Sequence, residues 1–325
     1  MRILFVADPL ETFKTYKDST FAMMHEAAAR GHGIYACVPA EIFWKSGETV
    51  QAQITEVKLT GEVGTAEQEV QWYEVASCSL RSLKDFDAVI MRKDPPFDAE
   101  FFYCTHFLEQ AQREGAKVFN LPSALRNHPE KMAVMEFPDY TPPTLITRED
   151  SRIREFHEQY KDIILKPLDG MGGSGILRIK EDGMNLGSAI EMLTDNGQST
   201  IMAQQYQPAI VKGDKRVLVM NGKPIPYALA RIPQGNDIRG NLAAGAVGVA
   251  QSLADEDRAI AEVVGARLAP RGLLLIGLDF IGNRITEINV TSPTGFQEIT
   301  KQTGFNVAGA FLDALEHRVQ IVDRS

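Results

Sequence analysis

Short apolar runs and amphipathic segments alternate along the first third of the chain, and this alternation limits the possible folds more than any other feature. Runs that predict strands lie at residues 2–7, 34–38, 88–91 and 117–121. Between them, Asp18 or Ser19 is expected to cap a helix that ends at Gly31, and a second helix is expected over 98–114. The alternation predicts an α/β fold with a parallel sheet, in which ligands lie beyond the carboxyl ends of the strands.

The composition narrows the function classes. With 34 Lys plus Arg against 43 Asp plus Glu, the 325-residue chain has a formal net charge of −9, which disfavours nucleic acid and anionic lipid as partners. No apolar run approaches the ~20 residues of a membrane-spanning helix, and the first run stops at Asp8, too early for a secretory signal. The three cysteines show no metal or disulfide spacing and fit a reducing cytoplasm. We therefore expect a cytoplasmic protein that meets anionic ligands with local cations.

A strand-rich α+β region is expected after a boundary near 120–126, with a short helix starting at Pro129 or Glu130. Its predicted strands lie at 163–168, 176–180, 200–204, 216–221 and 226–232, and its predicted helices at 186–194 and 306–318. Residues 232–248 are too polar and glycine-rich for a core, so they predict either a functional lid or a disordered loop.

Glycines at positions 170, 172, 173 and 175 separate two of these predicted strands. Because a strand and not a helix follows, the pattern differs from a dinucleotide fingerprint and is typical of a flap whose backbone closes over nucleotide phosphates. The alternative is a plain hairpin. Lys166 enters this turn between aliphatic residues, and a lysine there is costly to bury unless it faces a cleft or an anion.

The strongest local signal is a predicted hairpin with two carboxylates on one face. If its loop is Gly282, Asn283 and Arg284, then Asp279 lies directly across from Glu287, and Asn289 shares their face. Like charges so placed are destabilising unless neutralised, and three oxygen donors suit a hard cation such as Mg²⁺. The alternative is an exposed acidic hairpin.

Two further cationic positions allow more than one interpretation. Arg92 and Lys93 follow the strand 88–91, where they could receive an anionic substrate or simply end the strand in solvent. Lys131 is expected at the start of a helix, where it could bind an anion together with the helix N-terminus or have no ligand at all.

Six blocks of the sequence, taken in order, resemble the ATP-grasp carboxylate-amine ligases, and more closely the bacterial glutathione synthetases. They span residues 91–98, 164–173, 213–218, 230–235, 239–245 and 286–294. The sequence departs from the family pattern at Pro129, Val247 and Gln297, where asparagine, a basic residue and arginine are expected. These departures concern the contacts that the loop 232–248 would make with bound substrate and the shape of the pocket for the dipeptide substrate.

The resemblance implies an N-terminal substrate (pre-ATP-grasp) domain over 1–125 and an ATP-grasp domain over 126–318, with subdomains at about 126–206 and 207–318 and a tail at 319–325. The residues that it implies for ATP binding are Lys131, Lys166, Gly170, Met171, Gly172, Gly173, Ser174, Gly175, Gln204, Gln205, Tyr206 and Asp214. Those implied for metal binding are Asp279, Glu287 and Asn289, and those implied for catalysis are Arg216, Arg231 and Lys166. Those implied for substrate binding are Arg92, Arg239, Asn241, Ser292, Pro293, Thr294 and Gly295.

The reaction that the resemblance implies is the ATP-driven joining of γ-glutamylcysteine and glycine through an acyl phosphate, with Mg²⁺ or Mn²⁺ bound and the loop 232–248 closing as a lid. It also implies a homotetramer. Two alternatives remain open: another ATP-grasp ligase, acting on D-alanine or glutamate, and a nucleotide-binding regulatory protein without catalysis. The Arg92 block and the Arg239 block favour glutathione synthesis, and the complete set of Lys166, Arg231 and the acidic hairpin disfavours a regulatory protein.

Overall fold

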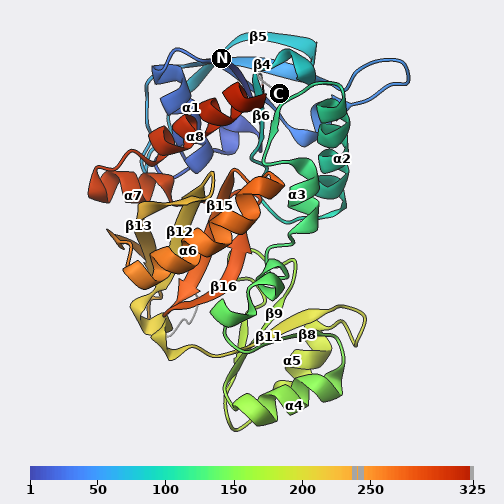
Figure 1. The fold of residues 1–325 in the computed structure, drawn as a ribbon, viewed down its shortest axis with the longest axis vertical. Helices are drawn as coiled ribbons and strands as arrows, with labels where there is room; N and C mark the ends of the chain where they lie inside the picture. Colours follow the sequence, from blue (N-terminus) through green and yellow to red (C-terminus); the bar gives the residue numbers. More distant parts are fainter. Residues whose placement is uncertain (236–239, 241–244, 323–325) are drawn as a thin grey trace.

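A computed structural model describes residues 1–235, 240 and 245–322 and arranges them around three β-sheets (Figure 1). The N-terminal sheet and its helices lie at one end of the molecule, a small four-stranded sheet lies at the other, and a five-stranded sheet lies between them. Within the described residues, no helix combines the length and the apolar character needed to cross a membrane.

The N-terminal sheet has a parallel centre, as predicted. Its order is β5-β4-β2-β1-β6-β7, with the short β3 also paired to β4, and the pairs β2–β1, β1–β6 and β6–β7 are parallel. Two antiparallel strands that were not predicted, β4 and β5, extend one edge. The strands are β1 (Arg2–Val6), β2 (Gly33–Cys37), β3 (Ile42–Phe43), β4 (Gln51–Leu59), β5 (Tyr73–Ser82), β6 (Ala88–Met91) and β7 (Val118–Phe119).

Helices α1 (Ser19–Ala29) and α2 (Ala99–Arg113) confirm both helix predictions in this part of the chain. Asp18 caps α1 by accepting a hydrogen bond from the Phe21 N–H at 2.7 Å, and Asp98 caps α2 in the same way. The start of α1 and the end of β6 matter for the site. Both lie beside the segment that follows β16, the last strand of the five-stranded sheet.

The four-stranded sheet, in the order β10-β9-β11-β8, is antiparallel throughout. Its strands are β8 (Thr144–Thr147), β9 (Ile163–Pro167), β10 (Leu177–Ile179) and β11 (Ile201–Gln205), and its helices are α4 (Asp150–Tyr160) and α5 (Leu186–Leu193). Apolar residues of both helices share a core with β9, β10 and β11. With one face of the sheet buried in this way, the other is available to a ligand.

The five-stranded sheet, in the order β14-β13-β12-β15-β16, carries most of the predicted site. Its strands are β12 (Asp214–Met220), β13 (Lys223–Ile232), β14 (Val247–Ser252), β15 (Leu275–Ile281) and β16 (Arg284–Asn289). The remaining helices are α3 (Pro122–Asn127), α6 (Asp255–Leu268), α7 (Phe296–Thr303) and α8 (Val307–Val322). The C-terminal helix α8 returns to pack on α1, so that the last described residues lie near the start of the chain (Figure 1).

The described residues also form short 3-10 helices. They are η1 (Leu10–Thr12), η2 (Pro39–Glu41), η3 (Leu83–Asp85), η4 (Ala133–Glu136), η5 (Pro138–Tyr140), η6 (Pro208–Lys212) and η8 (Ala269–Arg271). The prediction of a helix starting at Pro129 or Glu130 is wrong: a turn occupies this position, η4 follows it, and the α-helix lies earlier, at α3. Lys131 therefore does not lie at a helix N-terminus, and the helix-dipole argument for its role does not apply.

The predicted lid, 232–248, lies partly outside the described residues. Arg239 and Asn241, both expected to bind substrate, are among the residues that the structure does not describe. Gly240 is described and is buried against Asp214, where an added Cβ would lie only 2.4 Å from the Asp214 Cβ. Only a glycine fits at this point of close contact.

Candidate active site

Two adjoining cavities hold most of the predicted site residues. The larger, of about 220 Å³, is lined by Lys131, Lys166, Gly170, Met171, Gly172, Gly173, Ser174, Arg216, Arg231, Asp279, Glu287, Asn289, Ser292 and Thr294, among others. The smaller, of about 90 Å³, is lined by Gln204, Gln205, Tyr206 and Asp214 and shares Lys166, Asp279 and Glu287 with the larger. The structure thus brings residues from separate segments between Asp94 and Thr294 into two cavities that share part of their walls.

The acidic pair lies where the sequence placed it, but for a different reason. Asp279 on β15 pairs directly with Glu287 on β16, as predicted. The connecting loop has two residues and not three, because Ile281 pairs with Arg284. An irregularity in the register beside Asp279 makes up the difference and leaves Thr286 as the extra residue of β16. The predicted loop was therefore wrong, while the predicted pairing is confirmed.

Two buried arginines neutralise Asp279. Arg216 lies across from it on β12 and donates from Nε to Oδ1 at 2.5 Å and from Nη2 to Oδ2 at 3.0 Å. Arg231 on β13 lies 2.9 Å from the same Oδ2 and 2.5 Å from Asp214 Oδ2. Burial by itself would raise the pKa of Asp279, but the two guanidinium groups outweigh it and hold this pKa below its usual range. Asp279 therefore stays ionised.

Asp214 is the less satisfied carboxylate of this group. Burial, opposed by Arg231 but reinforced by Asp279, raises the pKa of Asp214 to about 6. Its Oδ1 is buried and has no hydrogen-bond partner among the described residues. A buried acceptor of this kind marks a position where a ligand hydroxyl would be stabilised.

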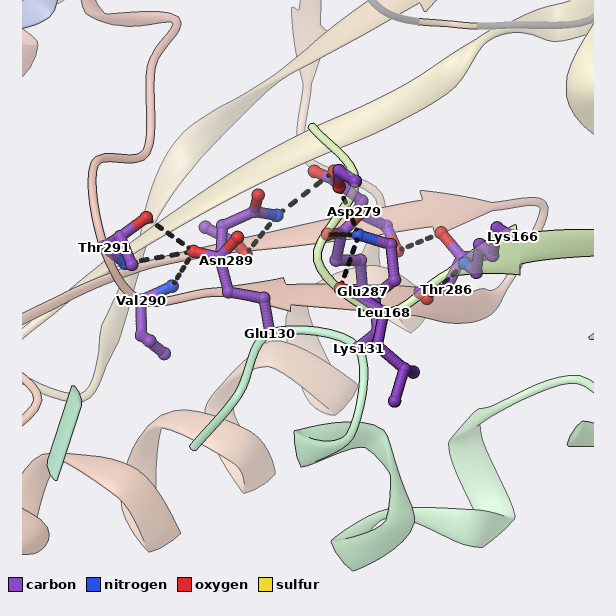
Figure 2. A network of polar contacts seen from close by, with 12 residues as sticks. Glu130, Lys131, Lys166, Leu168, Asp279, Thr286, Glu287, Asn289, Val290 and Thr291 are labelled. Atoms are coloured by element: carbon purple, nitrogen blue, oxygen red, sulfur yellow. Dashed lines mark hydrogen bonds and ion pairs between the residues drawn. The ribbon is translucent and has the colours of Figure 1, made fainter. Parts of the chain in front are cut away.

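The two predicted lysines, Lys131 and Lys166, lie beside the acidic hairpin (Figure 2). Lys131 Nζ donates to the Gly170 carbonyl at 2.6 Å and to Glu287 Oε1 at 3.1 Å. Lys166 Nζ donates to the Thr286 carbonyl at 3.1 Å, so the extra residue of β16 supplies its acceptor. Burial, with a contribution from Lys131, lowers the pKa of Lys166 to about 8, although Glu287 opposes the shift.

The glycine segment joins β9 to β10, which confirms the strand–turn–strand unit predicted from the sequence. Gly172, Gly173 and Gly175 have positive φ values, a region that other residues rarely adopt. Gly170 is confined for a different reason: a Cβ there would lie 2.8 Å from a Pro167 ring carbon and 3.0 Å from the Ser174 carbonyl. The segment therefore presents backbone to the cavity with few side chains in between. Gly175 itself does not line either cavity.

The predicted metal ligands share one edge of the hairpin. Asn289 donates from Nδ2 to Asp279 Oδ2 and to the Gly277 carbonyl, both at 3.2 Å, which leaves its Oδ1 as an acceptor (Figure 2). No group of three His, Cys, Asp or Glu residues that could hold a metal exists among the described residues, since this set contains two carboxylates and one amide. Such a set suits a cation that takes its other ligands from a phosphate-bearing substrate.

The predicted substrate residues divide into two groups. Ser292 and Thr294 line the larger cavity, and Ser292 donates a hydrogen bond to Asp94. Arg92 is only 4% exposed and lines neither cavity: Nε donates to Thr20 Oγ1 at 3.0 Å and Nη2 to the Pro293 carbonyl at 3.2 Å. Pro293 and Gly295 likewise line neither cavity. In the described structure, Arg92 therefore braces the segment that carries Ser292.

Sequence reasoning missed several polar residues of the site: Asp94, Gln207 and Thr286 line the cavities, and Glu130 and Thr144 make contacts that shape them. Glu130 Oε1 accepts from the Val290 N–H at 2.9 Å, the Thr291 N–H at 3.1 Å and the Thr291 hydroxyl at 2.8 Å, and so fixes the chain just after β16 (Figure 2). Thr144 on β8 contacts Gln204. Neither position carried a periodic or motif signal, because each contact joins segments that are far apart in sequence.

Comparison with known proteins places the chain in a family. The family model described as "Prokaryotic glutathione synthetase, N-terminal domain" matches residues 1–126, and the one described as "Prokaryotic glutathione synthetase, ATP-grasp domain" matches 130–304. The chain belongs to the prokaryotic glutathione synthetase family. As a member, it is an ADP-forming carbon–nitrogen ligase of ATP-dependent glutathione synthesis.

Relatives in the prokaryotic glutathione synthetase family match the chain along almost its whole length. The glutathione synthetase of Ralstonia nicotianae is 57% identical over 316 residues, which cover 97% of this chain and 95% of the relative. That of Nitrosomonas europaea is 50% identical over 319 residues and 98% of both chains. Among solved structures, D-cycloserine synthetase DcsG is similar with a TM-score of 0.68 at 15% identity, covering 98% of this chain and 100% of that one. At that identity the likeness concerns the fold alone.

Proposed function

We propose that the larger cavity joins γ-glutamylcysteine to glycine through an acyl phosphate, with ATP bound across both cavities. The observation that supports this best is the convergence of Lys131, Lys166, Arg216 and Arg231 on one acidic hairpin beneath a glycine flap. A carboxylate is a poor acyl donor, and four cations in one cavity suit the transfer of a phosphoryl group onto it. The family supports glutathione as the product over the D-alanine or glutamate ligase alternative.

In this proposal the smaller cavity holds the nucleoside of ATP. Gln204, Gln205 and Tyr206 line it together with the aliphatic side chains of four isoleucines. Asp214 offers to a ribose hydroxyl its Oδ1, which has no partner within the described part of the chain. The glycines from Gly170 to Gly175, with Met171 and Ser174, close over the phosphates, which Lys131 and Lys166 contact.

A divalent cation is part of the proposal, held by Asp279, Glu287 and Asn289. The set of two carboxylates and one amide oxygen fits Mg²⁺, and Mn²⁺ is a possible substitute. When bound, the cation would neutralise phosphate charge. The two arginines that now pair with Asp279 would then be free to turn toward the phosphoryl group.

The chemistry proceeds in two steps. A carboxylate oxygen of γ-glutamylcysteine forms a bond to the γ-phosphorus of ATP, and the bond to the ADP oxygen breaks. The glycine nitrogen then attacks the acyl carbon, phosphate leaves with the C–O bonding electrons, and the amine loses a proton. Arg216 and Arg231 stabilise the charge that develops in each step, and Lys166 holds the phosphates in line.

The substrate pocket is proposed to lie beside Ser292 and Thr294, with Arg92, Pro293 and Gly295 supporting its wall. Arg239 and Asn241, which lie outside the described residues, are also proposed to bind substrate. They belong to the segment 232–248, which would close as a lid and exclude water from the acyl phosphate. The division into domains over 1–125 and 126–318 belongs to the same proposal.

We also propose that the enzyme is a cytoplasmic homotetramer. All three cysteines, Cys37, Cys78 and Cys104, carry free thiols, as suits a reducing compartment. Light scattering on the purified protein would give its mass, and a particle of one or two chains would overturn the tetramer.

The decisive experiment follows phosphate release from ATP and Mg²⁺ with γ-glutamylcysteine, with and without glycine, and identifies the product by mass. γ-Glutamylcysteine labelled with ¹⁸O in its cysteinyl carboxylate tests the intermediate. Transfer of one ¹⁸O atom to the released phosphate is the expected result, because the labelled oxygen leaves with phosphorus. Tripeptide formation without this transfer would overturn the acyl phosphate.

A further inference from the structure

A chain of two hydrogen bonds fixes the orientation of the Gln204 side chain. Gln204 on β11 lies directly opposite Thr144 on β8, so both side chains are on the same face of the four-stranded sheet. The Thr144 hydroxyl donates to the Pro142 carbonyl at 2.8 Å, and Gln204 Nε2 donates to Thr144 Oγ1 at 3.0 Å.

The direction of these bonds follows from chemistry. The Pro142 carbonyl can only accept, so the single hydroxyl proton of Thr144 is committed to it. Thr144 Oγ1 can then only accept, and the amide of Gln204 must present its NH₂ group to this oxygen. The Gln204 Oε1, which has no partner among the described residues, is therefore the atom left for a ligand.

Gln204 belongs to a cavity whose lining suits a planar base. Gln204 is only 4% exposed and lines the smaller cavity, of about 90 Å³, together with the aliphatic side chains of Ile164, Ile176, Ile210 and Ile281. Ile164 pairs directly with Gln204 across β9 and β11, and Lys166 follows two residues later on the same face. A nucleotide whose base lies among the isoleucines would thus present the edge of the base to Gln204 and its phosphates to Lys166.

We propose that Thr144 makes the cavity selective for a 6-aminopurine nucleotide over a 6-oxopurine nucleotide. An exocyclic amino group donates to the fixed Gln204 Oε1, whereas a carbonyl at the same position meets another acceptor. Turning the amide around to suit the carbonyl would place Gln204 Oε1 against Thr144 Oγ1, whose proton is held by Pro142. Thr144 is a positioning residue that acts through Gln204. The inference rests on the proposed placement of the nucleoside in this cavity.

The test compares ATP with inosine triphosphate, which carries a carbonyl in place of the amino group, in the wild type and in Thr144→Val. Valine keeps the shape and the strand preference but cannot accept from the amide. We expect the ratio of kcat/KM for ATP over inosine triphosphate to fall about fivefold to tenfold, through KM and with kcat nearly unchanged. Thr144→Ser should restore the wild-type ratio. Thr147→Val, on the opposite face of β8, should leave it unchanged.

Three outcomes would overturn the inference: a wild type that uses both nucleotides equally, an unchanged ratio in Thr144→Val, or a Thr144→Ser variant that behaves like the valine variant. Each is separate from failure of the proposed function, which would appear as a wild type that forms no tripeptide with ATP. Thermal unfolding of each variant without nucleotide checks the fold, and a change in KM alone with an unchanged unfolding temperature supports a positioning role.

Discussion

Replacing Lys166 with methionine is expected to stabilise the protein in the absence of nucleotide while it abolishes tight nucleotide binding. Lys166 is 6% exposed, and burial lowers its pKa from the ordinary 10.5 to about 8. The difference corresponds to about 3 kcal/mol that the folded state loses at pH 7 by keeping the group charged. Methionine removes this cost but leaves the Thr286 carbonyl without its donor, which costs about 1 to 2 kcal/mol. We therefore expect a net gain of about 1 to 2 kcal/mol.

The pH dependence of this gain follows from the direction of the shift. Because the pKa of Lys166 is lower in the folded state, both states are protonated below pH 8 and the cost is fully present there. Between about 8 and 10.5 the unfolded state binds more protons, so the free energy of unfolding of the wild type rises relative to that of the variant. The stability curves of the two proteins should converge as the pH rises from 7 to 9.5.

Urea denaturation without nucleotide, followed by circular dichroism at several pH values, measures the effect. Lys180→Met is the matched control, since Lys180 is exposed just beyond β10 and its replacement should change the free energy of unfolding by less than about 0.5 kcal/mol. Adding ATP and Mg²⁺ should stabilise the wild type and the control, but not Lys166→Met. A Lys166→Met variant that is less stable than the wild type at pH 7, by an amount that does not change with pH, would refute the reasoning.

Three other substitutions test separate parts of the site. Arg216→Met removes the bidentate partner of buried Asp279; we expect unfolding to become easier by about 3 to 5 kcal/mol and kcat to fall at least ~100-fold, measured by denaturation and by phosphate release. Gly170→Ala forces a Cβ against the Pro167 ring and the Ser174 carbonyl, so the KM for ATP should rise about tenfold and the unfolding temperature should fall by a few degrees. Glu287→Gln weakens the proposed cation site, and a Mg²⁺ titration of activity should shift about tenfold or more to higher concentration, whereas loss of kcat without that shift would contradict the assignment.

The parts of the fold that the sequence predicted are those specified by local periodicity. The strand at β6 and the helix at α1 follow from runs of apolar residues at the spacing of each element. The edge strand β5 was not predicted, because it is exposed along almost its whole length and its sequence, YEVASCSLRS, has no buried face. Its position comes from pairing with β4, and that pairing is not visible in either segment alone.

In the site, too, local sequence patterns predicted some residues, whereas contacts between distant segments determine others. Asp279 and Glu287 could be paired from the sequence because strands alternate side chains with a fixed period. The role of Glu130 could not be predicted from the sequence, because it depends on contacts with Val290 and Thr291, which are 160 and 161 residues away. The error over the loop before Glu287 has a similar origin: nothing local distinguishes a three-residue loop from a two-residue loop combined with one extra residue at Thr286.

The charges in the larger cavity explain how a protein of net charge −9 can bind a polyanion. Four cations and four carboxylates line this cavity, and in the described structure the cations are paired with the carboxylates or with backbone carbonyls. Without such pairing, buried charges of one sign would repel one another strongly in a medium of low dielectric constant. Binding of a metal nucleotide would then exchange partners: the cation would take the carboxylates, and the phosphates would take Lys131 and the arginines. A site that is built to bind an anion must keep a cation buried even when the anion is absent, and this burial destabilises the nucleotide-free protein. Lys166→Met removes the buried cation, and for this reason we expect it to stabilise the protein.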